Sequence, residues 1–551
     1  MHLLGFLSFE GTGEARAWLT VLAAGMCALP SRWLWGVLGS IGPWSAIVVV
    51  GVVSFVAVAG LAIKRGIPRP YVHDEFSYLL AGDTFAHGRL TNPQHPMWEH
   101  FESMHILARP TYMSKYPPGQ GLALALGQAV TGEPIWGVWV ATVLASAAMC
   151  WMLMAFVPVR WALVGGLMAA LHPQMLEWGQ RYWGATLAAL GGALAIGGWG
   201  RMISIRGGRQ SSVWSWREAM WMGVGMVVLA NTRPYEGAVL AGVLVLGLVW
   251  RMVSEKGRIA GAWGMWGAMA GVLAVGAGLM AYYNWRVTGS AFRLPYQEHQ
   301  SQYGAVPLFI FQARGAQPAY RHKEIETFQV REQVYWYKRH DSWYELRKEA
   351  IKNLGRLRAG CLGNVEVLAL PLVLLPWMVW KVRRVRWLVG VLAVVTGALL
   401  LETYCFPHYA TPAAGVVAVI AVMALRRMSR LGWPMGRLMA RVTVGVFVAW
   451  SAVWWAGFYN WKQEGFAVAR HEVLEGLKKQ EGKHLVIVRY GEHNVHEEWV
   501  YNEAEIDEAK VVWAREMDTE HNRKLLEYFK DRKVWLIEPD VDMRELKEWG
   551  K

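Results

Sequence analysis

The chain has 551 residues, of which 54% are hydrophobic and only 18% are charged. Soluble domains usually carry about 25% charged residues, so this composition excludes an ordinary soluble domain and favours a polytopic membrane protein. The formal net charge is +14, which in a membrane protein is typical of cytoplasmic loops rich in Lys and Arg. We therefore expect a lipid bilayer, and no nucleic acid, as a partner. The four cysteines show neither metal-ligand spacing nor a disulfide framework.

Apolar segments recur along the chain at lengths close to the ~20 residues of a bilayer crossing, and we expect about 11–13 transmembrane helices. The candidate spans are 17–37, 43–63, 135–157, 160–174, 184–203, 217–232, 236–251, 259–283, 362–380, 387–402, 408–425 and 438–458. The apolar run 119–131 is too short to cross and follows two prolines. It is predicted to form a re-entrant or interfacial helix.

Basic residues in the short loops set the orientation. Four clusters lie at 201–217, 251–258, 381–386 and 426–441, and alternating spans place all four on one face, which we assign to the cytoplasm. The first loop (64–134), the long loop (284–361) and the tail then share the outer face. We expect an integral protein of a bacterial inner membrane with an extracytoplasmic C-terminal domain.

The tail differs in composition from the rest of the chain. Apolar runs at 484–488, 510–513 and 534–537 alternate with helical patterns near 463–480 and 518–530. This alternation predicts a small α/β domain over 460–551, following an all-α transmembrane domain over 1–459.

The first outer loop begins with an acid pair, Asp74-Glu75. Phe76, Leu79 and Leu80 follow with i, i+3, i+4 spacing, which predicts an amphipathic helix lying at the membrane interface. Site acids cluster in clefts, although Asp74 could instead only cap this helix.

A lysine marks the other end of the same loop. Lys115 precedes Tyr116, two prolines and the predicted helix. An ammonium beside free N–H groups of a helix N-terminus forms an anion site, although a lysine at this position could also snorkel to the interface.

The order of these motifs resembles the GT-C superfamily of membrane glycosyltransferases, in the branch of the protein O-mannosyltransferases and the lipid A aminoarabinose transferase. The resemblance covers about residues 40–460 and includes three further short motifs on the outer face. They are Asn231-Thr232-Arg233-Pro234-Tyr235-Glu236, Arg293-Leu294-Pro295-Tyr296 and Phe406-Pro407-His408-Tyr409-Ala410-Thr411-Pro412.

The resemblance implies transfer of a sugar from a polyprenyl-phosphate donor to a lipid, glycan or protein acceptor outside the membrane. Asp74 would then orient or deprotonate the acceptor, and Glu75 could share its proton, bind a metal or hydrogen-bond within the loop. Lys115 would stabilise the leaving phosphate, with Arg233 or Arg293 as the second cation. Further candidates for substrate contacts are Tyr116, Glu177, Tyr296 and His408.

The chain departs from the pattern in the next outer loop. Several members of the superfamily carry a second acid there, but the expected place near Trp183-Gly184 has none, and Glu177 lies several residues earlier. Glu177 could substitute for it. A transporter or flippase, and a non-catalytic member of the same fold, therefore remain as alternative hypotheses. The transporter would require charged residues deep inside several spans.

One group of polar residues in the first loop has the side chains of a metal site. It comprises His95, Glu99, His100, Glu102 and His105. Imidazole and carboxylate groups could hold a divalent cation, but the spacing matches no standard zinc motif, and a solvated polar loop is the simpler interpretation. No other cofactor is expected.

Overall fold

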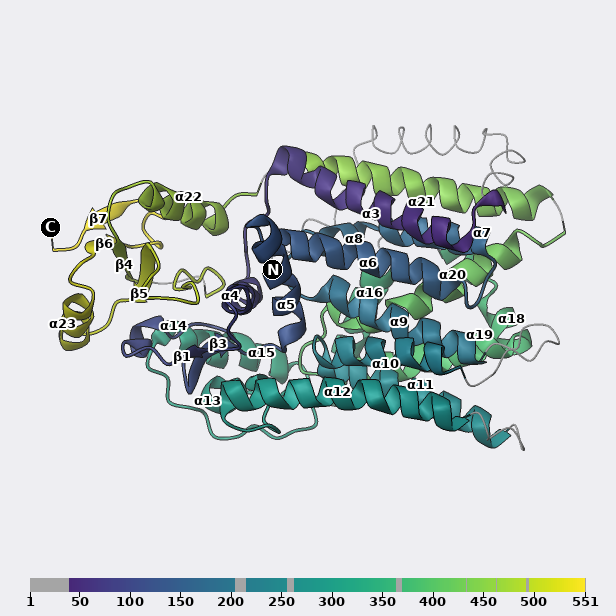
Figure 1. Cartoon of the computed structure of the whole chain (residues 1–551), viewed down its shortest axis with the longest axis horizontal. Helices are drawn as coiled ribbons and strands as arrows, with labels where there is room; N and C mark the ends of the chain where they lie inside the picture. Colours follow the sequence, from purple (N-terminus) through teal and green to yellow (C-terminus); the bar gives the residue numbers. More distant parts are fainter. Residues whose placement is uncertain are drawn as a thin grey trace.

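The computed structural model describes residues 39–203, 215–254, 262–362, 369–432, 434–461, 463–491 and 495–550. Its long helices run side by side in a bundle, and the C-terminal part of the chain projects from one end of this bundle (Figure 1). Two helices, α4 (His73–Ala86) and α5 (Pro118–Thr131), lie between these two parts. The all-α membrane architecture with a small α/β domain is therefore confirmed.

Six described helical segments are long and apolar enough to cross a membrane. They are α3 (Pro43–Arg65), α6 (Ile135–Leu153), α11 (Pro234–Ser254), α12 (Ala262–Thr288), α20 (Ala414–Met428) with the preceding 3-10 turn from Pro407, and α21 (Pro434–Asn460). Shorter or less apolar helices complete the bundle: α7 (Val159–Ala170), α9 (Ala185–Ile203), α10 (Trp216–Ala230) and α19 (Arg383–Leu399). Each corresponds to a span predicted from the sequence.

Two of the predicted spans do not correspond to a single described helix. The segment 362–380 is not one long helix, because its described part forms two short helices, α17 (Ala369–Leu372) and α18 (Leu375–Lys381). Pro376, at the start of α18, lacks the N–H that would bond to Leu372 in a continuous helix. The span predicted at 17–37 lies outside the described residues.

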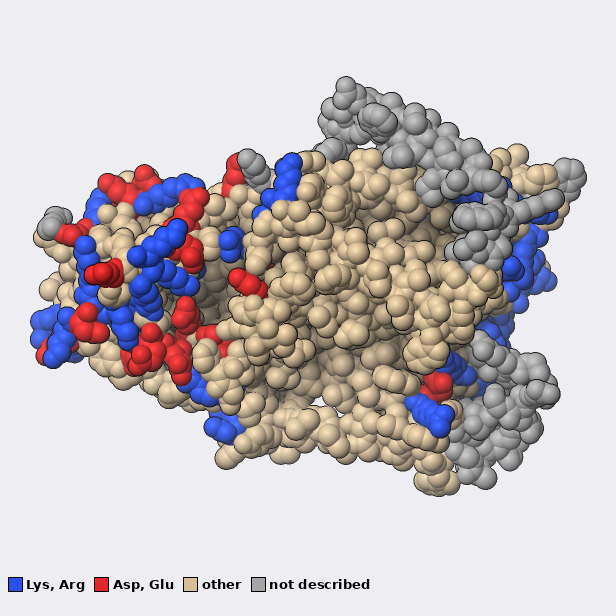
Figure 2. Space-filling model, turned by 45° about the horizontal axis from the view of Figure 1, so that its top comes forward, with Lys and Arg blue, Asp and Glu red and all other residues tan. Residues whose placement is uncertain are grey.

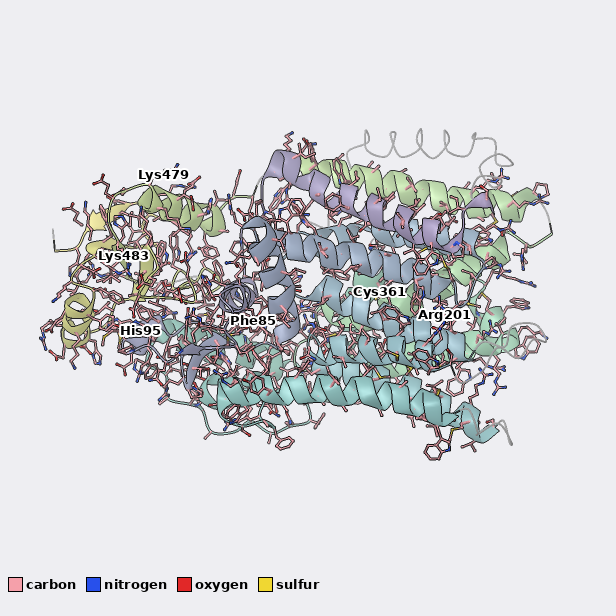
Figure 3. The ribbon with its side chains drawn as sticks, in the orientation of Figure 1. Phe85, His95, Arg201, Cys361, Lys479 and Lys483 are labelled. Atoms are coloured by element: carbon pink, nitrogen blue, oxygen red, sulfur yellow. The ribbon has the colours of Figure 1, made fainter. Side chains whose placement is uncertain are left out.

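Charged side chains are concentrated at the two ends of the molecule. Figure 2 shows acidic and basic residues mixed over the C-terminal part, mostly basic residues at the opposite end, and few charges on the bundle between them. In Figure 3, Arg201 lies towards the basic end, whereas His95, Lys479 and Lys483 lie in the opposite part. The uncharged middle carries exposed apolar side chains such as Val52, Leu246 and Leu279, as a lipid-facing surface does.

The tail folds into a four-stranded sheet in the order β5-β4-β6-β7. Strands β4 (His484–Val488), β5 (Val511–Arg515) and β6 (Lys533–Ile537) are parallel, and helices α22 (Phe466–Lys478) and α23 (Thr519–Tyr528) accompany them. The strands and helices expected in the tail are thus confirmed. A short antiparallel strand, β7 (Leu546–Glu548), was not predicted, because its residues are mostly polar and half-exposed.

The hydrophobic core of this domain extends into the first loop (64–134). Phe76 and Leu80 of α4 and Tyr112 of β3 (Thr111–Ser114) pack in the same core as the tail strands. The ring of Phe76 stacks on that of Tyr501 with centroids 4.2 Å apart. The tail therefore buries one side of α4 and fixes it against the bundle.

The long loop (284–361) is largely helical. It contains α13 (Pro295–Tyr303), α14 (Lys323–Glu326), the π-helical turn Thr327–Glu332, α15 (Gln333–Lys338) and α16 (Trp343–Leu362). The first loop contains the 3-10 turn Trp98–Phe101 and a small antiparallel sheet in which β3 lies between β1 (Asn92–Pro93) and β2 (Ile106–Leu107). The short helix α8 (Pro173–Trp178) lies in the loop between α7 and α9.

Candidate active site

The acid pair begins α4, and its two carboxylates have different environments. Val72 is the residue before the helix, and Glu75 Oε2 accepts hydrogen bonds from the backbone N–H groups of Tyr71 (2.8 Å) and Val72 (3.3 Å). Glu75 Oε1 accepts a third from Tyr182 N (3.1 Å), and the residue is fully buried. Glu75, and not Asp74, therefore caps the helix, and both Glu75 oxygens are used on backbone amides.

This burial corrects one expectation about α4. The helix does not show one buried face and one exposed face, as the predicted amphipathic pattern requires, because its residues are buried on most faces, including His73, Tyr78, Ala81 and Thr84. Asp83 joins both neighbours of the helix, since its oxygens accept from Gln128 Nε2 of α5 (2.8 Å) and from Ala504 N of the tail (2.7 Å).

Asp74 is held through one oxygen only. Its Oδ1 accepts a short hydrogen bond from the Tyr116 hydroxyl and lies 3.3 Å from His105 Nε2. The side chain is 34% exposed, and neither of these contacts uses Oδ2. Asp74 thus has a fixed orientation and one oxygen available to a substrate.

His105 connects this acid to the lysine at the end of the loop. Lys115 Nζ lies 2.7 Å from His105 Nδ1, and because an ammonium only donates, Nδ1 is the acceptor. The proton of the neutral ring is then on Nε2 and points at Asp74. The loop therefore contains a continuous chain of three side chains, Asp74, His105 and Lys115.

The backbone at His105, the middle residue of this network, has a strained conformation. His105 has φ of +65°, a left-handed conformation that is uncommon for residues other than glycine. Its carbonyl accepts from Ser77 Oγ (2.6 Å) and from Lys115 N (3.2 Å). Strain of this kind persists where surrounding contacts determine the conformation, and it is common at functional sites.

Lys115 is buried beside two aromatic rings. Its Nζ lies 4.7 Å from the centroid of the Tyr296 ring and 5.1 Å from that of Tyr116. Burial lowers the pKa of Lys115 to about 8, although the Asp74 carboxylate opposes this shift. Burial also lowers the pKa of His105 well below its ordinary value, and the Lys115 charge adds to this effect. His105 is therefore neutral, and Lys115 titrates just above neutral pH.

A second cation lies in the Arg233 turn. Its guanidinium lies 4.5 Å from the centroid of the Tyr409 ring, and Nη1 lies 3.8 Å from Glu236.

Burial raises the pKa of Tyr296, and the carboxylates of Asp74 and Glu402 raise it further. Tyr296, on α13, is therefore close enough to Asp74 to be affected by its charge.

His408 stacks on Trp183, with centroids 4.8 Å apart and planes 15° from parallel. The ring of His408 also contacts Tyr409 (4.8 Å, edge to face), the residue that faces Arg233. The late motif at 406–412 thus joins the Arg233 turn to the loop in which the second acid was expected.

The two remaining candidates, Arg293 and Glu177, contact residues outside the network of Asp74, His105 and Lys115. Arg293 is 46% exposed and binds Glu298 (2.8 Å) and Ser301 (2.7 Å), both on α13. Glu177 accepts from Gln174 Nε2 (2.6 Å) in α8, and burial raises the pKa of its carboxyl. Neither contact joins these side chains to the Asp74–His105–Lys115 chain.

The five residues considered as metal ligands point to different partners. His95 binds Asp507 (2.9 Å), and His100 lies 2.8 Å from the carbonyl of Arg515. Glu99 and Glu102 both pair with Arg321, at 3.1 and 2.9 Å, whereas His105 faces Asp74. Across the described residues, no group of three or more His, Cys, Asp or Glu is arranged to hold a metal ion.

Sequence reasoning missed the role of His105 and the acids beside Arg233. His105 was assigned only to the metal group, and its place between Asp74 and Lys115 depends on the β2–β3 pairing that brings residues 105 and 115 together. Glu236 was visible three residues after Arg233, the spacing of neighbours on one helix face. Glu402 had no comparable signal.

Comparison with known proteins gives structural matches only. No family model and no curated protein matches the sequence. Among solved structures, the chain is similar to ArnT from Cupriavidus metallidurans bound to undecaprenyl phosphate, with a TM-score of 0.49 and 13% identity over 90% of this chain and 89% of that one. It is also similar to the Archaeoglobus fulgidus oligosaccharyltransferase in complex with Zn and sulfate, with a TM-score of 0.49 and 12% identity over 80% of this chain.

The chain spans 60% of the length of that oligosaccharyltransferase. Because the identities are only 12–13%, the chemistry of the site depends on the side chains present in this protein and on their contacts.

Proposed function

We propose that the protein is a membrane glycosyltransferase that moves a sugar from a polyprenyl-phosphate donor to a nucleophilic acceptor on the outer face of the membrane. The observation that carries this proposal is the chain from Asp74 through His105 to Lys115, which places a carboxylate with an available oxygen in one network with a buried cation. Such a pair can serve the two ends of a displacement reaction, the nucleophile and the leaving group.

Asp74 Oδ2 would accept the proton of the acceptor hydroxyl or amine as that group attacks the anomeric carbon. The bond from this carbon to the phosphate oxygen breaks, and the electron pair leaves with the lipid phosphate. Tyr116 and His105 hold Asp74 Oδ1 during this step, so the carboxylate needs little reorganisation. Attack from the side opposite the phosphate inverts the anomeric centre.

Lys115 would stabilise the developing negative charge on the phosphate. Its position beside the N-terminus of α5, which begins at Pro118, adds the positive end of the helix dipole to the charge of the ammonium. Arg233 is the second cation, because its turn contacts α5 directly, through the hydrogen bond from Gly119 N to Asn231 O (2.8 Å). Arg293 is a weaker candidate because it is 46% exposed and lies 2.8 Å from Glu298, whereas Arg233 is 14% exposed and lies 3.8 Å from Glu236.

The orientation follows from the charged ends of the molecule. The basic end would face the cytoplasm, and the site, the outer loops and the C-terminal domain would face outwards, in a bacterial inner membrane.

The test is a transfer assay with purified protein. A panel of polyprenyl-phosphate sugars is incubated with the protein, and release of polyprenyl phosphate is followed. We expect release from at least one donor, which Asp74→Asn and Lys115→Met both abolish. Full release by either variant would refute the assignment of the site.

A further inference from the structure

The loop that follows α19 contains an acid, Glu402, to which the proposed reaction gives no role. A backbone bridge joins Glu402 to Phe309 of the long loop, and backbone hydrogen bonds of 2.8 and 3.0 Å hold the two segments together on either side of it. The ring of Phe309 contacts that of Tyr235, with centroids 4.8 Å apart, and the Tyr235 hydroxyl donates to the backbone at the end of α19 (3.0 Å). Glu402 is therefore fixed against the turn that carries Arg233 and Glu236.

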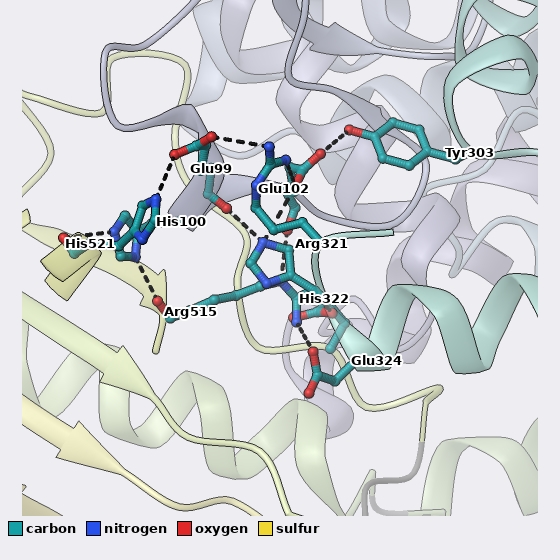
Figure 4. A network of polar contacts seen from close by, with 10 residues as sticks. Glu99, His100, Glu102, Tyr303, Arg321, His322, Glu324, Arg515 and His521 are labelled. Atoms are coloured by element: carbon teal, nitrogen blue, oxygen red, sulfur yellow. Dashed lines mark hydrogen bonds and ion pairs between the residues drawn. The ribbon is translucent and has the colours of Figure 1, made fainter. Parts of the chain in front are cut away.

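Other acids of the loops and the tail that have little exposure pair with arginine. Glu102 is 5% exposed and lies 2.9 Å from Arg321, and Glu324 lies 3.3 Å from the fully buried Arg515 (Figure 4). An ion pair of this kind allows a carboxyl group to stay charged away from water. A buried acid without such a pair is better accommodated in its neutral form, because burial disfavours the charge.

Glu402 lacks such a pair. Its Oε1 is buried and has no hydrogen-bond partner, and no ion pair with Glu402 occurs among the described residues. Arg233, the cation of the neighbouring turn, pairs instead with the buried Glu236 (3.8 Å). Burial raises the pKa of Glu402 to about 9, and the charge of Glu236 adds to this shift, whereas Arg233 opposes it. The carboxyl group of Glu402 is therefore protonated at neutral pH.

Tyr296 connects Glu402 to the rest of the candidate site. The carboxyl groups of Asp74 and Glu402 both act on the Tyr296 hydroxyl, as does the charge of Arg233. The ring of Tyr296 also lies 4.7 Å from Lys115 Nζ. Glu402 thus belongs to one cluster with Lys115 and Arg233, the two cations proposed to bind the phosphate of the sugar donor.

A protonated carboxyl group at this place has a defined chemical use. It can donate a hydrogen bond to a phosphate oxygen, which an ionised carboxylate would repel. The atom available for this contact is Oε2, since Oε1 is enclosed. The second ionisation of a phosphate is near pH 6, well below the pKa of Glu402, so the proton stays on the acid after the lipid phosphate has left the sugar.

We propose that Glu402 binds the sugar donor, with its carboxyl O–H donating a hydrogen bond to an oxygen of the polyprenyl phosphate held by Lys115 and Arg233. The contact adds an uncharged hydrogen-bond donor to the two cations. This role rests on the proposed glycosyltransferase function.

Equilibrium binding of undecaprenyl phosphate to the full-length protein in detergent at pH 7 tests this contact. Glu402→Leu should bind at least about tenfold more weakly, the scale of one hydrogen bond to a charged group. Glu402→Gln should stay within about twofold of the wild type, because its amide also donates. Glu345→Gln, the same change at an exposed acid that pairs with Lys348, should leave the affinity unchanged. Wild-type affinity in Glu402→Leu, or an equal loss in Glu402→Gln and Glu402→Leu, would overturn the proposal.

A pH series tests the protonation without the Leu variant. In Lys115→Arg both cations keep their charge, so the affinity should fall only about twofold from pH 7 to 9, and about tenfold from pH 8 to 10, as Glu402 loses its proton. Adding Glu402→Gln to this variant should remove the fall. A constant affinity in Lys115→Arg from pH 8 to 10, or the same fall in the double variant, would overturn the proposal.

The surrounding groups do not produce this fall. The other titratable groups that interact with Glu402 are Arg233, Tyr235, Glu236, Tyr296, Cys405 and Tyr409. All of them are kept in the double variant, so a fall caused by any of them would persist there. The comparison therefore isolates the proton of Glu402.

The two proposals fail in different ways. If the wild type neither binds undecaprenyl phosphate nor releases it from any sugar donor, both proposals are overturned. If the wild type does both, and the Glu402 variants behave like Glu345→Gln, only the role of Glu402 is overturned.

Discussion

The protonation of Lys115 provides a sharp test of the proposed donor site. Burial lowers the pKa of this side chain to about 8, and only its charged form attracts a phosphate. With this pKa, about nine-tenths of the molecules carry the ammonium at pH 7 and about one-tenth at pH 9. The affinity for a polyprenyl phosphate should therefore fall about tenfold between these pH values, which corresponds to about 1.4 kcal/mol.

Equilibrium binding of undecaprenyl phosphate to detergent-solubilised protein at pH 7, 8 and 9 measures this loss. Lys115→Arg is the matched control, because a guanidinium stays charged over the whole range, and its affinity should change little with pH. The phosphate itself does not account for the loss, since its second ionisation is near pH 6. A wild-type affinity that is constant from pH 7 to 9, or an equal loss in Lys115→Arg, would refute this reasoning.

Replacing the carboxylate by the matching amide should have different consequences at Asp74 and at Glu75. Asp74→Asn should lower the rate of transfer by about 10²–10⁴-fold, the usual contribution of a general base, with no change in thermal unfolding. Glu75→Gln should instead destabilise the protein by about 1–3 kcal/mol, since it weakens hydrogen bonds to buried amides; an unchanged melting temperature would contradict this role. Arg515→Met should cost about 3–5 kcal/mol because it removes the guanidinium that pairs with the buried Glu498 carboxylate in the tail core. The double variant with Glu498→Gln should recover most of this loss in the same thermal assay, and a double variant as unstable as Arg515→Met would argue against the pairing.

The sequence was sufficient for the local features. Apolar runs of spanning length predict the bundle helices because a bilayer crossing requires about 20 apolar residues. The two prolines before Gly119 predict the start of α5, since proline fits the first turn of a helix. Apolar runs alternating with helical patterns likewise predict the parallel strands of the tail, because strands buried on both faces are continuously apolar.

Only the tertiary structure decided which side chains meet. The sequence presents Asp74 and Glu75 as an equal pair, but the backbone amides around Glu75 make it the cap and leave Asp74 for the site. His105 is ten residues from Lys115 in the chain, and the pairing of β2 with β3 brings the two side chains within hydrogen-bonding distance. Periodicity fixes an element because its cause is local, whereas the composition of a site depends on contacts between residues distant in the chain, which no local pattern records.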